Sequence, residues 1–244
     1  MRRFGVATII LIVFTATVFA EKKDVMIAAA DGFALKATLY SPGKIGPGIL
    51  LLHQCNADRQ IYDTLGTMLS VAGYNALTLD FRGFGGSRNA EYKDLAASRD
   101  KMPSDVDAAF KFLTSQDQVN KTVIGVVGGS CGVNQAIQAA RRHPEIKTLV
   151  LLSGGTDADG EAFIKSSVKM PIMGAAGEED INAAASIKKL VGLSTNRDST
   201  LSMFKGAGHA ATMFEKEPDL QADIVIWFRT NLPVSGYAVL PSLK

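Results

Sequence analysis

A serine inside a glycine-rich turn constrains the fold of this chain more than any other feature. The segment Gly128–Gly132 reads Gly-Gly-Ser-Cys-Gly; strand-forming residues precede it over 122–127, and helix-forming residues follow it over 133–142. This order places Ser130 at the apex of a tight turn, in a sparsely populated backbone conformation that small neighbours permit. Its hydroxyl then lies at the carboxyl edge of a sheet, and the N–H of Cys131 lies at a helix start, where it can stabilise negative charge. A turn that serves only packing can share this pattern, so the rest of the chain decides between the two interpretations.

Short apolar runs alternate with amphipathic stretches on both sides of this turn. The alternation predicts one α/β domain, with a mostly parallel eight-stranded sheet and helices on both faces. A chain of 244 residues, 47% of them hydrophobic, can bury one such core. The apolar runs predict strands over 25–29, 33–40, 49–52, 74–81, 122–127, 148–152, 172–176 and 200–204. The amphipathic spacing predicts helices over 59–72, 103–114, 133–142, 160–167, 181–191 and 218–232.

Two local signals refine this topology. Asp31-Gly32 is typical of a hairpin turn, so the first two strands are expected to pair antiparallel at one edge of the sheet. Only about 16 residues separate Gly155 from Pro171, which leaves room for a minimal lid and not for a lid domain.

Residues 1–20 have the features of a secretory signal peptide. Arg2 and Arg3 precede an apolar run, and Val18-Phe19-Ala20 predicts cleavage after Ala20. We therefore expect a single domain over 21–244 that is periplasmic or secreted and has no membrane contact after cleavage; the alternative is an uncleaved anchor. Removing the two arginines from 26 basic residues leaves 24, which balance the 24 acidic ones.

Several functional classes find no support in the sequence. Blocks of basic residues are absent, so no nucleic-acid partner is predicted. Three histidines and two cysteines, without H-E-x-x-H or C-x-x-C spacing, argue against a metal site. We expect neither a metal nor an organic cofactor.

Three loops at predicted strand ends carry residues with complementary chemistry. Ser130, Asp180 and His209 occur in that order along the chain. A serine hydroxyl needs a base to take its proton, a histidine titrates in the right range, and a carboxylate holds the histidine in one tautomer and stabilises its cation. Loops after parallel strands share one edge of the sheet, so the three side chains can meet there. Asp157, at the end of the preceding strand, is the alternative acid, and Glu178, Glu179 and Asp159 are further local competitors.

Over residues 24–232 the chain resembles the α/β-hydrolase superfamily, in which the order serine, acid, histidine is expected. Its compact layout is most similar to the dienelactone-hydrolase-like and small serine esterase branches. The motifs that carry the resemblance are Leu51-Leu52-His53-Gln54-Cys55, Leu79-Asp80-Phe81-Arg82-Gly83-Phe84-Gly85-Gly86-Ser87, the Ser130 turn, Gly177-Glu178-Glu179-Asp180 and Gly206-Ala207-Gly208-His209.

The resemblance implies roles for further residues. The oxyanion hole of this superfamily takes one N–H from the loop after an early strand and one from the residue after the nucleophile, which assigns Cys55 and Cys131, with Gln54 as the alternative to Cys55. His53 is then expected to order its loop, and Asp80 and Arg82 to be structural. His143 is expected to be a surface histidine at a helix end.

Two departures from the family pattern matter. His53-Gln54 stands where the superfamily usually has His-Gly, and Ser130 stands where dienelactone hydrolases proper have a cysteine nucleophile. The substrate of those enzymes therefore does not carry over, and Cys131 is not the expected nucleophile because Ser130 occupies the centre of the motif.

Both cysteines of the chain fall at the two expected oxyanion positions, on loops that must lie side by side. In an exported protein they could form a disulfide, Cys55–Cys131, that fixes the hole. Two free, apolar thiols are the alternative.

The expected function is that of a serine hydrolase, carboxylesterase-like, which cleaves a small-molecule acyl ester through an acyl-enzyme on Ser130. A peptidase or a thioesterase is the alternative among hydrolases. A non-catalytic binding protein with the same fold is the alternative from another class, because fold does not imply function.

Overall fold

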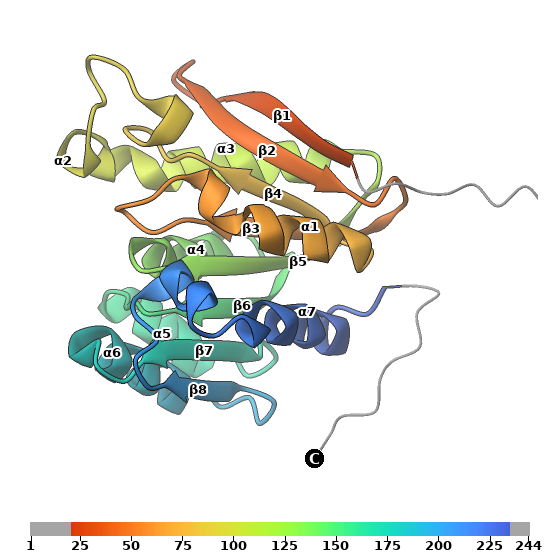
Figure 1. Ribbon diagram of the computed structural model, residues 1–244. Coiled ribbons are helices and arrows are strands. Elements are labelled where there is room, and N and C mark those ends of the chain that lie inside the picture. The colour runs from red at the N-terminus through yellow and green to blue at the C-terminus, as the bar shows by residue number, and fades with distance from the viewer. Residues whose placement is uncertain (1–20, 235–244) are drawn as a thin grey trace, which may run out of the picture.

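The computed structural model describes residues 21–234, which form an α/β domain around a single twisted sheet (Figure 1). The predicted signal peptide at 1–20 and the C-terminal residues 235–244 lie outside the described residues. Within the described range, no helix combines the length and the apolar character needed to cross a bilayer.

In the described part of the chain the sheet has eight strands, in the order β1-β2-β4-β3-β5-β6-β7-β8. The first pairings, β1 with β2 and β2 with β4, are antiparallel, and every pairing from β4 onward is parallel. The predicted fold class is thus confirmed, with a mixed sheet that is antiparallel only at one edge. The strands are β1 Glu21–Ala28, β2 Ala34–Ser41, β3 Gly46–Leu52, β4 Asn75–Leu79, β5 Val119–Gly129, β6 Ile146–Leu152, β7 Ile172–Gly177 and β8 Thr200–Phe204.

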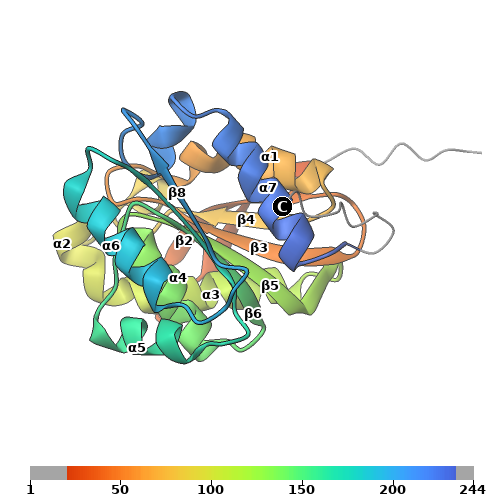
Figure 2. The same cartoon turned by 90° about the horizontal axis from the view of Figure 1, so that it is seen from below.

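Helices cover both faces of this sheet (Figure 2). The helices α3, α4, α5 and α6 pack on one face, and α1 and α7 pack on the other. Their bounds are α1 Asp63–Val71, α2 Leu95–Ser98, α3 Met102–Ser115, α4 Cys131–Arg142, α5 Ala158–Ser166, α6 Ile181–Leu193 and α7 Asp219–Asn231. The described residues also form the 3₁₀ helices η1 Arg59–Tyr62, η2 Gly85–Ser87, η3 Arg99–Lys101 and η4 Ala210–Glu215.

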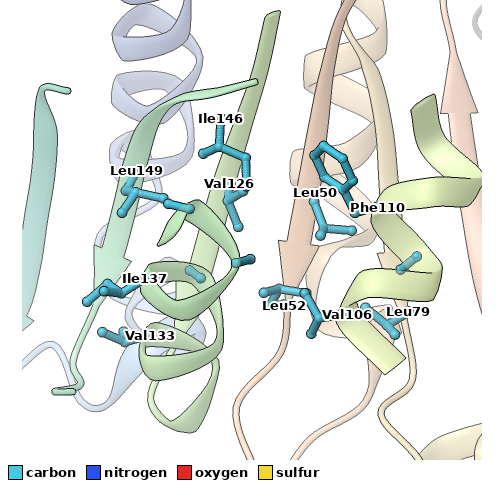
Figure 3. Close-up of a cluster of buried hydrophobic side chains, with 14 of the residues drawn as sticks. Leu50, Leu52, Leu79, Val106, Phe110, Val126, Val133, Ile137, Ile146 and Leu149 are labelled. Atoms are coloured by element: carbon cyan, nitrogen blue, oxygen red, sulfur yellow. The ribbon is translucent and has the colours of Figure 1, made fainter. Parts of the chain in front are cut away.

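The central strands are buried on both sides, which explains why they are almost continuously apolar. Along β3, Leu50 and Leu52 face the cluster under α3 and α4, while Ile49 and Leu51 face the cluster under α1 and α7. Successive strand residues point to opposite faces, so both faces of a covered sheet must be apolar. Figure 3 shows the first cluster, in which side chains of β3, β4, β5 and β6 meet those of α3 and α4.

Two of the differences from the predicted bounds have a clear physical cause. Strand β1 begins at Glu21, four residues before the apolar run, because Glu21 to Asp24 pair with β2 at an exposed sheet edge where charged side chains reach solvent. The helix predicted over 59–72 is divided into η1 and α1, and the side chain of Asp58 caps η1 by accepting the N–H of Gln60 at 2.9 Å.

Ionic side chains tie the loop after β4 to its surroundings, as expected for Asp80 and Arg82. The fully buried Asp80 accepts from Arg59 Nη1 at 2.8 Å and from the N–H of Gly86 at 2.7 Å. Arg82 is also buried and bridges Asp105 and Asp31, each at 2.7 Å. Buried charges persist in a fold only when they are paired in this way, so these residues organise the loop.

One of these ion pairs predicts how stability depends on pH. Hydrogen bonds from Arg82 hold the pKa of Asp31 at about 2, below its usual 3.8. A depressed pKa in the folded state stabilises the fold above about pH 4, and this contribution is lost as the pH falls towards 2. Because the Asp31 side chain is 40% exposed, solvent screening reduces the contribution.

We expect wild type to have a larger free energy of unfolding than Asp31→Asn at pH 6. At pH 2.5 this difference between the two proteins should be smaller. Urea unfolding of both proteins across this range measures the difference. A difference that is the same at every pH would contradict the linkage.

Candidate active site

Ser130 has the backbone that its turn requires. It lies between β5 and α4 with φ 53° and ψ −115°, a backbone conformation that residues other than glycine rarely adopt. Its N–H donates to Leu152 O at 2.8 Å, which ties the turn to the end of β6. The strained turn leaves the half-buried serine at the carboxyl edge of the central strand.

The outer glycines of the motif are needed for close approach. A Cβ at Gly128 would lie 2.4 Å from Gly132 O, and a Cβ at Gly132 would lie 2.4 Å from Leu52 O. Neither distance is sterically tolerable, so larger residues would push α4 away from β3 and β5. The spacing of glycines around the serine is thus explained by backbone packing.

The acid and the histidine meet at the same edge. Asp180 follows β7 at the start of α6, and His209 lies between β8 and η4; Asp180 Oδ2 is 2.5 Å from His209 Nδ1. The imidazole side chain is 40% exposed and the carboxylate 24%, so the base can be reached from solvent while the acid is more shielded. Since Nδ1 faces the carboxylate, Nε2 is the ring nitrogen left for a reaction.

The competing acids have other partners. Asp157 caps α5 by accepting the N–H of Gly160 at 2.8 Å, and it also accepts from Gln138. Asp159 pairs with Arg141. Glu179 accepts the N–H of Gly206 at 2.7 Å, which lowers its pKa and links the loop of Asp180 to the loop of His209. The structure therefore places Asp180, and none of these acids, against the histidine.

The loops of Ser130 and His209 converge around Gly129. A Cβ built on Gly129 would lie 3.5 Å from Ala210 Cβ and 3.7 Å from Gln54 N. Residues adjacent to the serine, to the histidine and to Cys55 are therefore neighbours in space. No hydrogen bond joins Ser130 Oγ to His209 within residues 21–234; such bonds are often long before a substrate binds.

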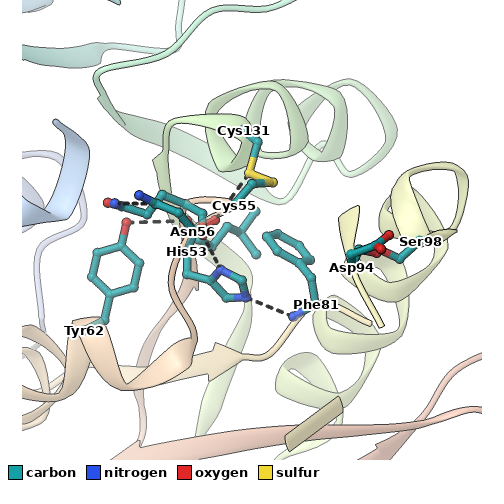
Figure 4. Close-up of a disulfide and its surroundings, with 10 residues drawn as sticks. His53, Cys55, Asn56, Tyr62, Phe81, Asp94, Ser98 and Cys131 are labelled. Carbon is teal, nitrogen blue, oxygen red and sulfur yellow. Dashed lines mark hydrogen bonds between the residues drawn. A yellow bond between two sulfur atoms is a disulfide. The ribbon is translucent and has the colours of Figure 1, made fainter. Parts of the chain in front are cut away.

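His53 orders the loop after β3, as the sequence predicts. Its Nδ1 lies 2.8 Å from Gln54 O, and its Nε2 accepts the N–H of Phe81 at 3.0 Å (Figure 4). Burial lowers the pKa of His53, so the ring is neutral and Nδ1 donates to the carbonyl. In a trans peptide the N–H of Cys55 points in the opposite direction to the carbonyl of Gln54. Within residues 21–234 this N–H donates no hydrogen bond.

A disulfide joins Cys55 to Cys131, with their Cα atoms 5.8 Å apart (Figure 4). Of the two hypotheses for the cysteines, the structure agrees with the bridge and not with free thiols. The bond connects the loop after β3 to the first residue of α4. It therefore holds together the two residues whose peptide N–H groups the superfamily pattern assigns to an oxyanion hole.

A pocket of about 570 Å³ lies beside the disulfide. Its walls come from the loop after β3, from the segment after β4 and from the start of α2, and they include Cys55, Phe84, Arg88 and Leu95. The pocket has the size of a small-molecule site. Among residues 21–234, no group of three or more histidine, cysteine, aspartate or glutamate side chains is arranged so that it could bind a metal ion.

His143 is less exposed than predicted. Its side chain is 22% exposed, contacts Asp107 at 2.8 Å and stacks on the ring of Phe110 at 3.9 Å between centroids. It caps the C-terminal end of α4, whereas Ser130 stands at the N-terminal end of the same helix.

Comparisons with known proteins agree with this architecture. A model of the dienelactone hydrolase family matches residues 35–230. The chain belongs to the dienelactone hydrolase family.

Solved structures share the fold of this dienelactone hydrolase family member. The esterase Pf2001 of Pyrococcus furiosus is 21% identical with a TM-score of 0.71, over 86% of this chain and 92% of that one. The dienelactone hydrolase from Anabaena variabilis is 19% identical with a TM-score of 0.69, over 87% of this chain and 99% of that one. An uncharacterized protein of Mycobacterium tuberculosis is 27% identical over 131 residues, which are 53% of this chain and 44% of that protein. This chain thus matches less than half the length of that relative.

Proposed function

We propose that the protein is an exported serine hydrolase, carboxylesterase-like, with Ser130 as nucleophile, His209 as base and acid, and Asp180 as the residue that orients the histidine. The observation that carries this proposal is the contact between Asp180 and His209 Nδ1 at the sheet edge that also bears the strained Ser130. An oriented imidazole at the same sheet edge as a half-buried, strained serine is the arrangement that can activate a hydroxyl for acyl transfer.

The proposed reaction has two halves. The Ser130 proton moves to His209 Nε2 as Oγ attacks the ester carbonyl, and the N–H groups of Cys55 and Cys131 stabilise the oxyanion. The intermediate collapses, the alcohol leaves with the proton from His209, and the acyl group stays on Oγ. Water then loses a proton to His209 and attacks the acyl-enzyme. The second intermediate collapses, His209 returns the proton to Ser130 Oγ, and the acid is released.

Two further observations support details of the proposal. The pocket beside the disulfide is lined by residues that include Cys55, and its volume is that of a small-molecule site, so small-molecule acyl esters are the proposed substrates. A disulfide between Cys55 and Cys131 suits an oxidising compartment, which supports export under the predicted signal at residues 1–20.

A fluorophosphonate probe tests the proposed nucleophile. We expect stoichiometric labelling of folded wild type, with the adduct on the peptide that contains Ser130, because only an activated serine reacts with the probe. Mass spectrometry of the intact and digested protein measures this. Labelling should be absent in Ser130→Ala and retained in Ser153→Ala, a variant of the neighbouring serine at the end of β6. Folded wild type that does not react would instead favour the non-catalytic binding protein.

A further inference from the structure

Gln54 occupies the position at which the superfamily usually has glycine, and its side chain is 1% exposed. Its Oε1 accepts the N–H of Ala211 at 3.0 Å, across 157 residues of sequence. Its Nε2 donates to Asn56 Oδ1 at 2.8 Å. The side chain of Gln54 thus connects its own loop, after β3, to the loop that carries the proposed base His209.

The bond to Ala211 lies at a sensitive position. Ala211 is the second residue of η4, two residues after His209, and the first N–H groups of a helix have no partner inside the helix. Ala210, between them, is buried and has φ 51°, a strained value that the surroundings must maintain. Gln54 therefore supplies the acceptor that fixes the chain immediately after the histidine.

The main chain of Gln54 is held equally firmly. Its carbonyl is 2.8 Å from His53 Nδ1 and accepts the N–H of Ala57 at 3.1 Å. Because main chain and side chain are both fixed, Gln54 links the loop that carries Cys55 to the loop of His209.

We propose that Gln54 is a positioning residue, which sets the imidazole of His209 relative to Ser130 and the oxyanion hole by accepting the N–H of Ala211. This inference rests on the proposed function and adds a residue to it. A misplacement of about 1 Å at a reacting group can cost about 10²-fold in rate, so the bond is expected to affect kcat more than KM.

Three substitutions test the role of Gln54. Gln54→Met keeps the volume but has no amide to accept the N–H of Ala211, and we expect kcat for p-nitrophenyl acetate to fall about 10- to 100-fold with little change in KM. Gln54→Asn keeps the amide but is one methylene too short, and we expect the same loss. Gln54→Glu keeps an acceptor oxygen in either protonation state, and it should recover most of the loss.

Gln135→Met is the matched control. Gln135 lies in α4, is 7% exposed, and its Oε1 has no hydrogen-bond partner. The same change at a buried glutamine that does not bind the His209 loop should leave kcat near that of wild type. Hydrogen exchange of the Ala211 amide, followed by NMR, should accelerate in Gln54→Met and not in Gln135→Met.

The inference is wrong if folded Gln54→Met and Gln54→Asn match wild type in kcat, or if the Ala211 amide exchanges equally slowly in all variants. Failure of the proposed function gives a different result. Wild type would then neither hydrolyse the ester nor react with the fluorophosphonate, while the exchange of the Ala211 amide would still respond to Gln54→Met.

Discussion

Asp180→Asn is expected to lower kcat on the order of 10⁴-fold while KM changes little. The carboxylate holds the proton of His209 on Nδ1 and stabilises the imidazolium that forms when Ser130 loses its proton. An asparagine amide can donate to Nδ1 instead, which would leave the proton on Nε2, the nitrogen that has to accept. Steady-state hydrolysis of a short acyl ester measures the loss.

Asp157→Asn is the control for this prediction. Asp157 was the alternative acid in the sequence, but in the structure it caps α5, and the side-chain oxygen of asparagine can still accept the N–H of Gly160. We expect a rate within a few-fold of wild type, since the change does not reach the imidazole. If Asp157→Asn lost activity and Asp180→Asn kept it, the assignment of the acid would be wrong.

Reducing the disulfide is expected to cost about 4 kcal/mol in the free energy of unfolding. Cys55 and Cys131 are 76 residues apart, and closing a loop of that length removes much of the entropy of the unfolded chain. For a domain of this size, such a loss corresponds to a fall of about 10 °C in Tm. Urea unfolding of wild type with and without a phosphine reductant measures it.

The double variant Cys55→Ala/Cys131→Ala separates reduction from other effects of the reductant. It should unfold at lower urea than untreated wild type, and the reductant should not change its midpoint. Two free thiols in untreated, unfolded wild type, or a midpoint of wild type that does not respond to the reductant, would contradict the bridge.

The parts of the molecule that sequence predicted well are those with local causes. The serine turn needs glycine at Gly128 and Gly132 because strand and helix touch there, and that need is visible in the five-residue motif. Asp180 and His209 each follow the end of an apolar run, so their common edge follows from a parallel sheet. Sequence leaves Asp157 open as the alternative acid because both aspartates stand directly before a helix. In the structure the Asp157 side chain caps its helix, whereas the Asp180 side chain makes no capping bond and contacts His209.

The parts that sequence did not predict have distant causes. The hydrogen bond from Ala211 to Gln54 joins residues 157 apart, and no periodicity of either segment indicates it. His143 was expected at the surface because it ends a helix, but Phe110 from α3 covers one side of its ring. The charged start of β1 becomes a strand only because β2 offers an open edge for pairing. Such contacts depend on packing between elements, which single-residue preferences do not contain.

Within residues 21–234, Ser130, Ser153 and Ala210 are the non-glycine residues with positive φ, and each follows a strand or begins a helix at the same rim of the sheet. Such conformations cost about 1–3 kcal/mol each and persist only where the rest of the domain enforces them. Selection of variants for heat resistance alone would therefore first favour substitutions that remove the backbone strain at these three positions. We expect the proteins obtained in that way to be sturdier and to be poorer catalysts.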